Sequence, residues 1–180
     1  MKTGPERLGW RRISRTAFLT LERDYLIEPS HRWSVREVVR HPGSVVVAPW
    51  DGERVVLIRQ YRHAAGRPLL ELPAGKLDVG GEPPEQTARR ECVEEVGLDP
   101  GRLVFLHGCY LSPGFTDEYC RIYLATDLSP APAQPHGFEE ESSSVVRLAP
   151  GEVRRRLDNA GFENAPTIIG LYALLDRLGR

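Results

Sequence analysis

Residues 72–98 read LPAGKLDVGGEPPEQTARRECVEEVGL, a glycine-rich loop followed by a segment with helical character. Pro83 and Pro84 predict the start of a helix, because proline is tolerated in a first helical turn but not in the helix interior. No further breaker occurs before Gly97, which stands where a left-handed C-terminal cap would fall. The stretch therefore predicts a loop and then a helix over residues 85–96.

Three glutamates lie in the last turns of this predicted helix. Glu91 and Glu95 are four residues apart and share a face, and Glu94 lies beside them. Like charges at this spacing repel, and acidic groups near a helix C-terminus oppose the helix dipole. A divalent cation would remove both penalties, since hard cations prefer carboxylate and carbonyl oxygens. The alternative is a solvated acidic face whose partners are Arg89 and Arg90.

The order of residues in this stretch resembles the Nudix box, G-x5-E-x7-R-E-U-x-E-E-x-G-U, in which U is apolar. The matching positions are Gly75, Glu82, Arg90, Glu91, Glu94, Glu95 and Gly97. From Glu82 onward the match is complete, with Cys92 and Leu98 at the apolar positions. One departure stands in the loop, where six residues instead of five separate Gly75 from Glu82. The resemblance implies an α/β fold, an α/β/α sandwich with a mixed sheet.

Other segments are similar to the ADP-ribose pyrophosphatase branch of that family. Pro113 follows Gly97 by sixteen residues, and residues 59–75 (RQYRHAAGRPLLELPAG) and 163–175 (ENAPTIIGLYALL) also look like this branch. The resemblance implies an Mg²⁺-dependent enzyme, with Mn²⁺ as the other candidate cation, that converts ADP-ribose and water to AMP and ribose 5-phosphate. The alternatives are a pyrophosphatase for ADP-glucose or GDP-mannose, and a non-catalytic nucleotide sensor.

The resemblance also implies which atoms hold the cation. Glu91 and Glu95 are the expected ligands, joined by Glu94 directly or through water and by the backbone carbonyl of Ala74. The general base is expected from an acidic loop outside the box.

The acidic cluster that fits this base is Glu139, Glu140 and Glu141. Glu141 aligns best with the segments that follow, and a one-residue shift gives Glu140. The alternative is a solvated loop with no catalytic role.

Four further residues of the box are expected to support the site. Arg90 stands four residues before Glu94 and would orient its carboxylate; the alternative is a surface ion pair worth under about 1 kcal/mol. Glu82 is either a ligand or a brace for the loop, and we favour the brace. Gly75 and Gly97 are structural in either case.

Substrate contacts are expected elsewhere in the chain. Arg62 would hold a phosphate by a bidentate contact. Arg36 and Glu37 lie where the N-terminal layer of this branch reaches the nucleoside. Trp33 would stack on adenine, since aromatic faces attract bases, or would equally well pack in a subunit interface. Pro113 would stiffen a turn at the ribose-phosphate end.

Composition argues against several other classes of protein. The 180 residues carry 24 Lys and Arg against 25 Asp and Glu, and a net charge of −1 gives no general attraction to nucleic acid or membranes. The three cysteines lack a C-x-x-C spacing, which argues against disulfides and structural zinc. No apolar run approaches the roughly 18 residues needed to cross a bilayer. The first residues lack the apolar core of a signal peptide, so a cytoplasmic setting is expected.

Three strands are expected near the N-terminus, around residues 13–21, 24–27 and 33–40. They would form a small antiparallel layer over residues 1–42, which is similar to the dimerisation sheet of the branch. An isolated small sheet is marginal in water, so we expect a homodimer. The alternative is that the layer packs on its own domain.

The Nudix domain is expected over residues 43–180. Asp51-Gly52 is a strong hairpin signal and predicts that residues 53–61 return along residues 44–49. Residues 128–137 hold three prolines and a glycine and are expected to form a loop. The remaining expected strands cover residues 69–72, 102–111, 118–127 and 142–148, and the expected helices cover residues 151–158 and 167–178.

Overall fold

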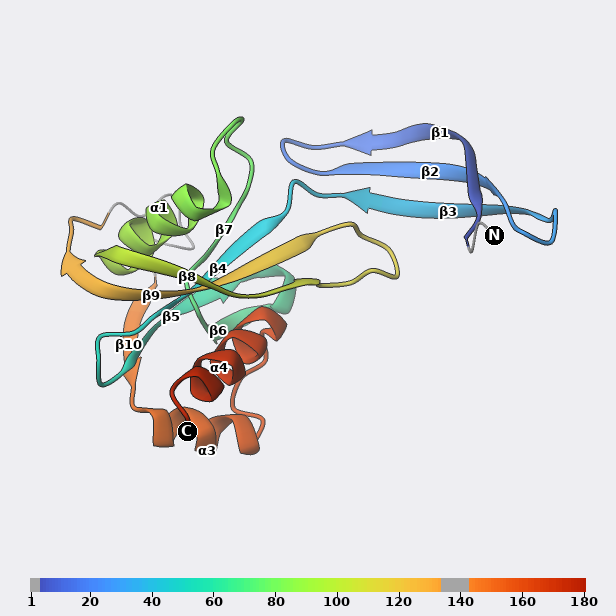
Figure 1. Ribbon diagram of the computed structural model, residues 1–180. Helices are drawn as coiled ribbons and strands as arrows, with labels where there is room; N and C mark the ends of the chain where they lie inside the picture. Colours follow the sequence, from blue (N-terminus) through green and yellow to red (C-terminus); the bar gives the residue numbers. More distant parts are fainter. Residues whose placement is uncertain (1–3, 134–142) are drawn as a thin grey trace. The chain divides into compact units, whose positions relative to one another are not determined.

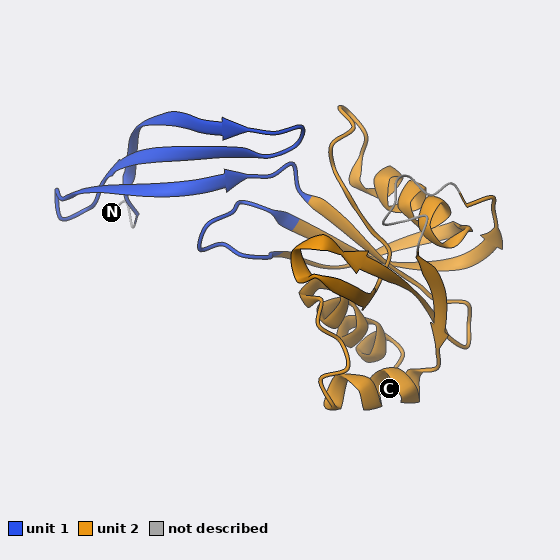
Figure 2. Cartoon of the chain, turned by 180° about the vertical axis from the view of Figure 1, so that it is seen from behind, with its two compact units in different colours: residues 1–43, 110–119 blue, residues 44–109, 120–180 orange. Residues whose placement is uncertain are grey.

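The chain divides into two compact units (Figure 2). Unit 1 contains residues 1–43 and 110–119, and unit 2 contains residues 44–109 and 120–180. The computed structural model describes residues 4–133 and 143–180. Within these described ranges, no helix has the length and apolar character required to span a membrane.

Unit 1 is built on a three-stranded antiparallel sheet in the order β1-β2-β3 (Figure 1). Its strands are β1 (Glu6–Arg15), β2 (Thr20–Ile27) and β3 (Trp33–Arg40). The predicted bounds of β3 are confirmed, but a strand over residues 13–21 is wrong. That range contains the turn between β1 and β2, where the Leu19 N–H donates to Thr16 Oγ1 at 3.0 Å and the Thr16 N–H donates to the Leu19 carbonyl at 2.8 Å. A hydroxyl that bonds to nearby backbone favours such a turn over a continuous strand.

A second segment of unit 1 comes from far along the chain. Residues 110–119 lie beside the end of β3, where the Val39 N–H donates to the Phe115 carbonyl at 2.8 Å. Asp117 accepts a hydrogen bond from the His41 N–H at 2.8 Å and one from Arg40 at 3.2 Å. The predicted turn at Pro113 is therefore bound to the N-terminal sheet, a contact that its own sequence did not indicate.

Unit 2 contains two sheets, three α-helices and one short 3₁₀ helix within the described residues. The elements are β4 (Ser44–Pro49), β5 (Val55–Arg62), the short helix η1 (His63–Ala65), β6 (Arg67–Glu71), β7 (Ala74–Lys76), α1 (Pro84–Val96), β8 (Leu98–Tyr110), β9 (Tyr119–Pro130), β10 (Ser144–Leu148), α3 (Pro150–Asp158) and α4 (Ala165–Arg177). One sheet is mixed, in the order β7-β4-β9-β8, and the other is antiparallel, in the order β10-β5-β6. The expected fold class is confirmed, although the sheet is split in two.

The core lies on both faces of β4, whose six residues are all buried. Both α1 and α4 pack against β4, and Figure 1 shows them on opposite sides of it. Val45 and Val47 join a cluster with Ala88 and Cys92 of α1. Because successive side chains of a strand alternate, Val46 points to the other face, toward α4.

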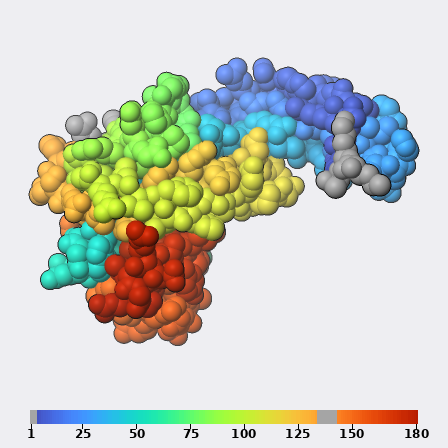
Figure 3. Space-filling view, in the orientation of Figure 1, coloured from blue at the N-terminus to red at the C-terminus, as the bar shows by residue number. Residues whose placement is uncertain are grey.

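The Asp51-Gly52 hairpin is the main correction in unit 2. The turn itself forms, because Asp51 Oδ1 accepts the N–H groups of Glu53 at 2.9 Å and Arg54 at 2.7 Å. Figure 3 shows residues 51–54 (cyan) at the surface, where all four are exposed. However, β4 and β5 belong to different sheets, and the pairing next to the turn is an isolated bridge between Trp50, which follows β4, and Val55. On its two edges, β4 pairs with β9 along all six residues and with β7 at residues 44–46, whereas β5 pairs with β6 and β10 in the other sheet.

The boundaries of α1 agree with the sequence signals. The helix begins at Pro84, and Gly97 adopts the left-handed conformation at φ 65° and ψ 32°. The Gly97 N–H donates to the Val93 carbonyl at 3.0 Å, which caps the helix. Another expected boundary was wrong, because β9 extends to Pro130 and so includes the first three residues of the expected 128–137 loop.

Candidate active site

Helix α1 presents two glutamates at the edge of the core. Ala88 and Cys92 have no exposed surface, and burial of this apolar stripe sets the rotation of the helix. Glu91 and Glu95 lie on a neighbouring face and are each only 8% exposed. Two carboxylates so nearly buried require compensating contacts.

The first two residues of β7, Ala74 and Gly75, contact both carboxylates. The Ala74 N–H donates to Glu95 Oε2 at 2.9 Å. At Gly75, an added Cβ would stand 1.9 Å from Glu91 Oε1, so the carboxylate lies directly over the glycine backbone. Glycine is therefore required there for close approach, since Gly75 is not among the positive-φ residues. Glu91 and Glu95 thus meet the same two-residue segment.

Arg90 binds three of the acidic residues around this point. It contacts Glu82 through Nε at 3.2 Å and Nη2 at 3.1 Å, and its Nη1 lies 2.9 Å from both Glu91 Oε1 and Glu94 Oε2. The hydrogen bonds to Glu82 are the main reason that the pKa of Arg90 is raised. Reciprocally, Arg90 is the main cause of the lowered pKa of Glu82, which Thr87 Oγ1 assists by donating at 2.9 Å. These contacts are those of a brace between the loop and the helix.

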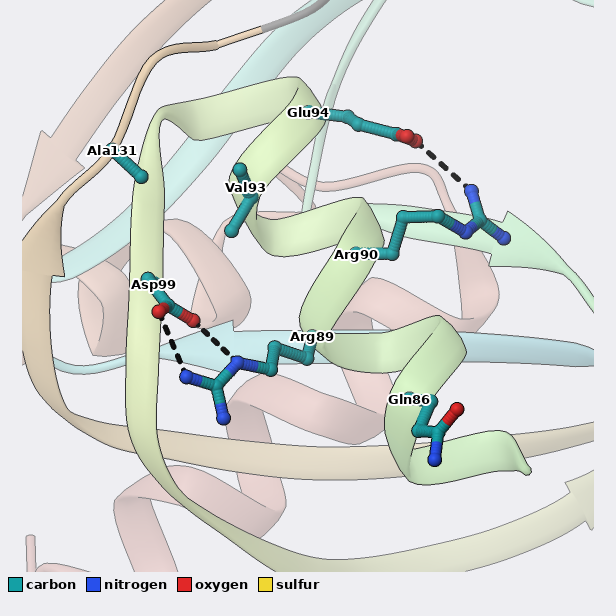
Figure 4. A pocket seen from close by; sticks show the side chains of 7 residues that line it. All are labelled: Gln86, Arg89, Arg90, Val93, Glu94, Asp99 and Ala131. Carbon is teal, nitrogen blue, oxygen red and sulfur yellow. Dashed lines mark hydrogen bonds and ion pairs between the residues drawn. The ribbon is translucent and has the colours of Figure 1, made fainter. Parts of the chain in front are cut away.

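The donor set fits a hard divalent cation. Glu91 and Glu95 offer carboxylate oxygens, and such oxygen ligands suit Mg²⁺ or Mn²⁺ better than softer metals. Glu94 is turned toward Arg90, as Figure 4 shows. Across residues 4–133 and 143–180, no three His, Cys, Asp or Glu side chains form a ready metal cluster. The roles of Glu94 and of the Ala74 carbonyl as ligands stay predictions.

Arg62 is engaged with a carboxylate that the sequence did not single out. Glu71 of β6 is 1% exposed, and Arg62 of β5 binds it in a bidentate manner, Nε to Oε1 at 3.1 Å and Nη2 to Oε2 at 2.8 Å. This pair fixes the plane of the guanidinium, because both oxygens of the carboxylate are used. A glutamate inside the apolar run Leu69–Leu72 was the available signal. The phosphate contact of Arg62 stays a prediction.

A hollow of about 380 Å³ opens beside Arg90 on the outer side of α1 (Figure 4). Its lining residues are Gln86, Arg89, Arg90, Val93, Glu94, Asp99 and Ala131. Arg89 forms an ion pair with Asp99, with Nε 2.6 Å from Oδ1. Of the two arginines proposed as partners for an acidic helix face, Arg90 has that role, whereas Arg89 binds the start of β8.

The residues predicted to contact the nucleoside (Arg36, Glu37 and Trp33) and the residue predicted at the ribose-phosphate end (Pro113) belong to unit 1. Arg36, Glu37 and Pro113 all line one hollow of about 450 Å³, bounded by the end of β3 and by residues 110–117. Glu37 forms an ion pair with Arg23, and Arg36 Nη1 donates to the Val35 carbonyl at 2.9 Å. Trp33, at the start of β3, is 69% exposed and does not belong to this lining.

The predicted general base cannot be placed in this site. Glu139, Glu140 and Glu141 lie outside the described residues. Their assignment rests on sequence alone.

Comparisons with known proteins agree on one family. A family model described as NUDIX domain matches residues 39–168. An ADP-ribose pyrophosphatase of Mycobacterium tuberculosis is 41% identical over 160 residues, covering 88% of this chain and 77% of that protein. An ADP-ribose pyrophosphatase of Bacillus subtilis is 34% identical over 147 residues, covering 81% and 79%. A solved structure described as an ADP compounds hydrolase superposes with a TM-score of 0.85 at 25% identity, over 98% of this chain and 95% of the other.

Proposed function

The chain belongs to the Nudix family, and from this premise we propose that it is a divalent-cation-dependent pyrophosphatase that hydrolyses ADP-ribose to AMP and ribose 5-phosphate. The observation that carries the proposal is the meeting of Glu91 and Glu95 with the backbone of Ala74 and Gly75. Relatives named ADP-ribose pyrophosphatase, similar over most of this chain, support the choice of substrate.

The cation site would use Glu91 and Glu95, with Glu94 and the Ala74 carbonyl as further ligands. A cation held there would offset the negative charge of the diphosphate and make an attacking water more acidic. Arg90 orients Glu91 and Glu94 through its Nη1, and it ties both to Glu82. We propose Mg²⁺ as the cation, with Mn²⁺ as a substitute.

The reacting diphosphate would be held and attacked by residues outside the box. Arg62 would bind a phosphate oxygen, and Glu71 would keep its guanidinium in one plane. One of Glu139–Glu141 would accept the proton of the attacking water, with Glu141 the first choice. A general base of this kind contributes roughly 10²–10⁴-fold to a rate.

The nucleoside end of the substrate would be bound in unit 1. Arg36 and Glu37 line a hollow that also contains Phe115 and Pro113, and Pro113 would stiffen the turn at the ribose-phosphate end. Trp33 would either stack on adenine or pack against a second subunit. Its 69% exposure, like the 48% exposure of Val35 on the same face of β3, supports a surface that another molecule covers. We propose a homodimer formed through this sheet and a cytoplasmic setting.

Two alternatives follow from the same fold. A pyrophosphatase for ADP-glucose would use the same cation site and differ in what the sugar end contacts, and one for GDP-mannose would also bind guanine in place of adenine. A non-catalytic sensor is disfavoured, because the box retains Glu91, Glu94 and Glu95.

A substrate panel tests the proposal. We expect kcat/KM at saturating Mg²⁺ to be highest for ADP-ribose among ADP-ribose, ADP-glucose and GDP-mannose, with AMP identified chromatographically as a product. Glu91→Gln is the matched control and should lose nearly all turnover. A higher kcat/KM for a hexose substrate would replace ADP-ribose by that sugar nucleotide. Absence of hydrolysis for all three at saturating Mg²⁺ would favour the sensor.

A further inference from the structure

The turn that connects β6 to β7, residues 72–74, forms contacts with helix α4. The Leu72 N–H donates to Thr167 Oγ1 at 3.0 Å, although the two residues are 95 positions apart. Thr167 is 1% exposed and so is Leu72, so this hydrogen bond is shielded from water. A buried N–H that loses its acceptor must find another or remain unsatisfied, which is unfavourable.

Thr167 is itself fixed at the start of α4. The side chain of Asn164 caps the helix and accepts the Thr167 N–H at 3.0 Å. One turn later, Gly170 lets the Leu72 side chain approach, since an added Cβ would stand 2.7 Å from Leu72 Cδ1. Helix α4 therefore holds Leu72 by its backbone and by its side chain.

The next backbone groups of the turn are held by other elements. The Pro73 carbonyl accepts the Val47 N–H of β4 at 2.8 Å, and the Ala74 N–H donates to Glu95 Oε2 at 2.9 Å. Proline has no N–H, so the donors on either side of it are those of Leu72 and Ala74. The Leu72 N–H is bound by α4 and the Ala74 N–H is bound by α1, so residues 72–74 are held by both helices.

We propose that Thr167 is a positioning residue for the cation site, because its hydroxyl sets where the Ala74 backbone meets Glu95 and Glu91. The inference rests on the cation site of the proposed function. Loss of the hydroxyl acceptor frees the Leu72 N–H, the turn shifts, and the Ala74 N–H no longer aligns with Glu95. Partners that orient ligands in this way typically change metal affinity by about 10–100-fold.

Metal binding without nucleotide tests this role. Mn²⁺ affinity is measured by electron paramagnetic resonance for wild type, Thr167→Val and Thr167→Ser. Thr167→Val keeps the shape and removes the acceptor, and we expect about tenfold weaker binding. Thr167→Ser keeps the hydroxyl and should bind within about twofold of wild type. Hydrogen exchange at the Leu72 amide should be faster in Thr167→Val alone.

A destabilised variant remote from the loop separates positioning from general stability. Val153→Ala removes buried volume in α3, where Val153 is 1% exposed, and should lower the melting temperature without changing Mn²⁺ affinity. Equal Mn²⁺ affinity for wild type and Thr167→Val, or equal losses for Thr167→Val and Val153→Ala, would overturn the role of Thr167. Absence of Mn²⁺ binding by wild type would instead overturn the cation site on which the inference rests.

Discussion

Adding a single methyl group at position 75 tests whether the close contact between the start of β7 and helix α1 is required to form the cation site. In Gly75→Ala the new Cβ would lie 1.9 Å from Glu91 Oε1, whereas ordinary van der Waals contact begins at 3.4 Å. The Glu91 carboxylate must therefore move by about 1.5 Å, or the loop must retreat by that distance, because packed interiors leave little slack.

A displacement of this size is large for a catalytic site. A misplacement of about 1 Å can cost about 100-fold in rate, so kcat for ADP-ribose should fall by about 100-fold or more. Mn²⁺ affinity should fall with it by at least about tenfold, because Glu91 is a proposed ligand. The fold should persist, since Gly75 is not among the positive-φ residues and alanine can adopt its backbone conformation.

Gly80→Ala, in the segment between β7 and α1, is the matched control, because an added Cβ there meets nothing within 4 Å. It should keep wild-type turnover, Mn²⁺ affinity and melting temperature. Because Gly75→Ala acts through Glu91, adding it to Glu91→Gln should cost little further activity. The reasoning is refuted if Gly75→Ala retains wild-type turnover and Mn²⁺ affinity, or if Gly80→Ala loses as much.

Three further predictions concern other residues. Replacing each member of Glu139–Glu141 with glutamine should reduce turnover at saturating Mg²⁺ by at least about 100-fold for one of them, and losses below about tenfold for all three would exclude a base there. Burial raises the pKa of Cys92 to about 12, so iodoacetamide at pH 8 should label it only after unfolding, as mass spectrometry would show; equal labelling of the folded protein would contradict this. Because Arg90 lowers the pKa of Glu82 in the folded state, their pair stabilises above the unfolded pKa of about 4.3 and this stability is lost as pH falls through the folded value. The stability deficit of Glu82→Gln in urea unfolding should therefore shrink from pH 7 to pH 3, and a constant deficit would count against the ion pair.

Local signals explain why α1 and β3 were predictable from sequence. Pro84 restricts the backbone at the start of the helix, and Gly97 adopts the left-handed conformation that other residues avoid. These effects act within a few residues and need no knowledge of the rest of the fold. The Asp51 turn was predictable for the same reason, since its side chain bonds to the next backbone N–H groups.

Contacts made by distant residues were not predictable in this way. Strand β4 pairs with β9, which lies more than 70 residues later in the chain. The hairpin signal at Asp51-Gly52 is local and carries no information on that pairing. It therefore could not show that β4 and β5 belong to different sheets. The hydrogen bond between Leu72 and Thr167 has the same character. At such positions the sequence shows only a polar residue within an apolar segment, as with Glu71. This signal indicates that the residue needs a hydrogen-bond partner but does not identify that partner.

The charges around α1 explain why a cation should be doubly charged. Arg90 contacts the carboxylates of Glu82, Glu91 and Glu94, and the Ala74 N–H donates to the carboxylate of Glu95. The single positive charge of Arg90 is therefore shared among three carboxylates, and it cannot offset all of their negative charge. Because Glu91 and Glu95 are each only 8% exposed, water screens the remaining negative charge poorly. A divalent ion offsets more of that remainder than a monovalent ion in the same position.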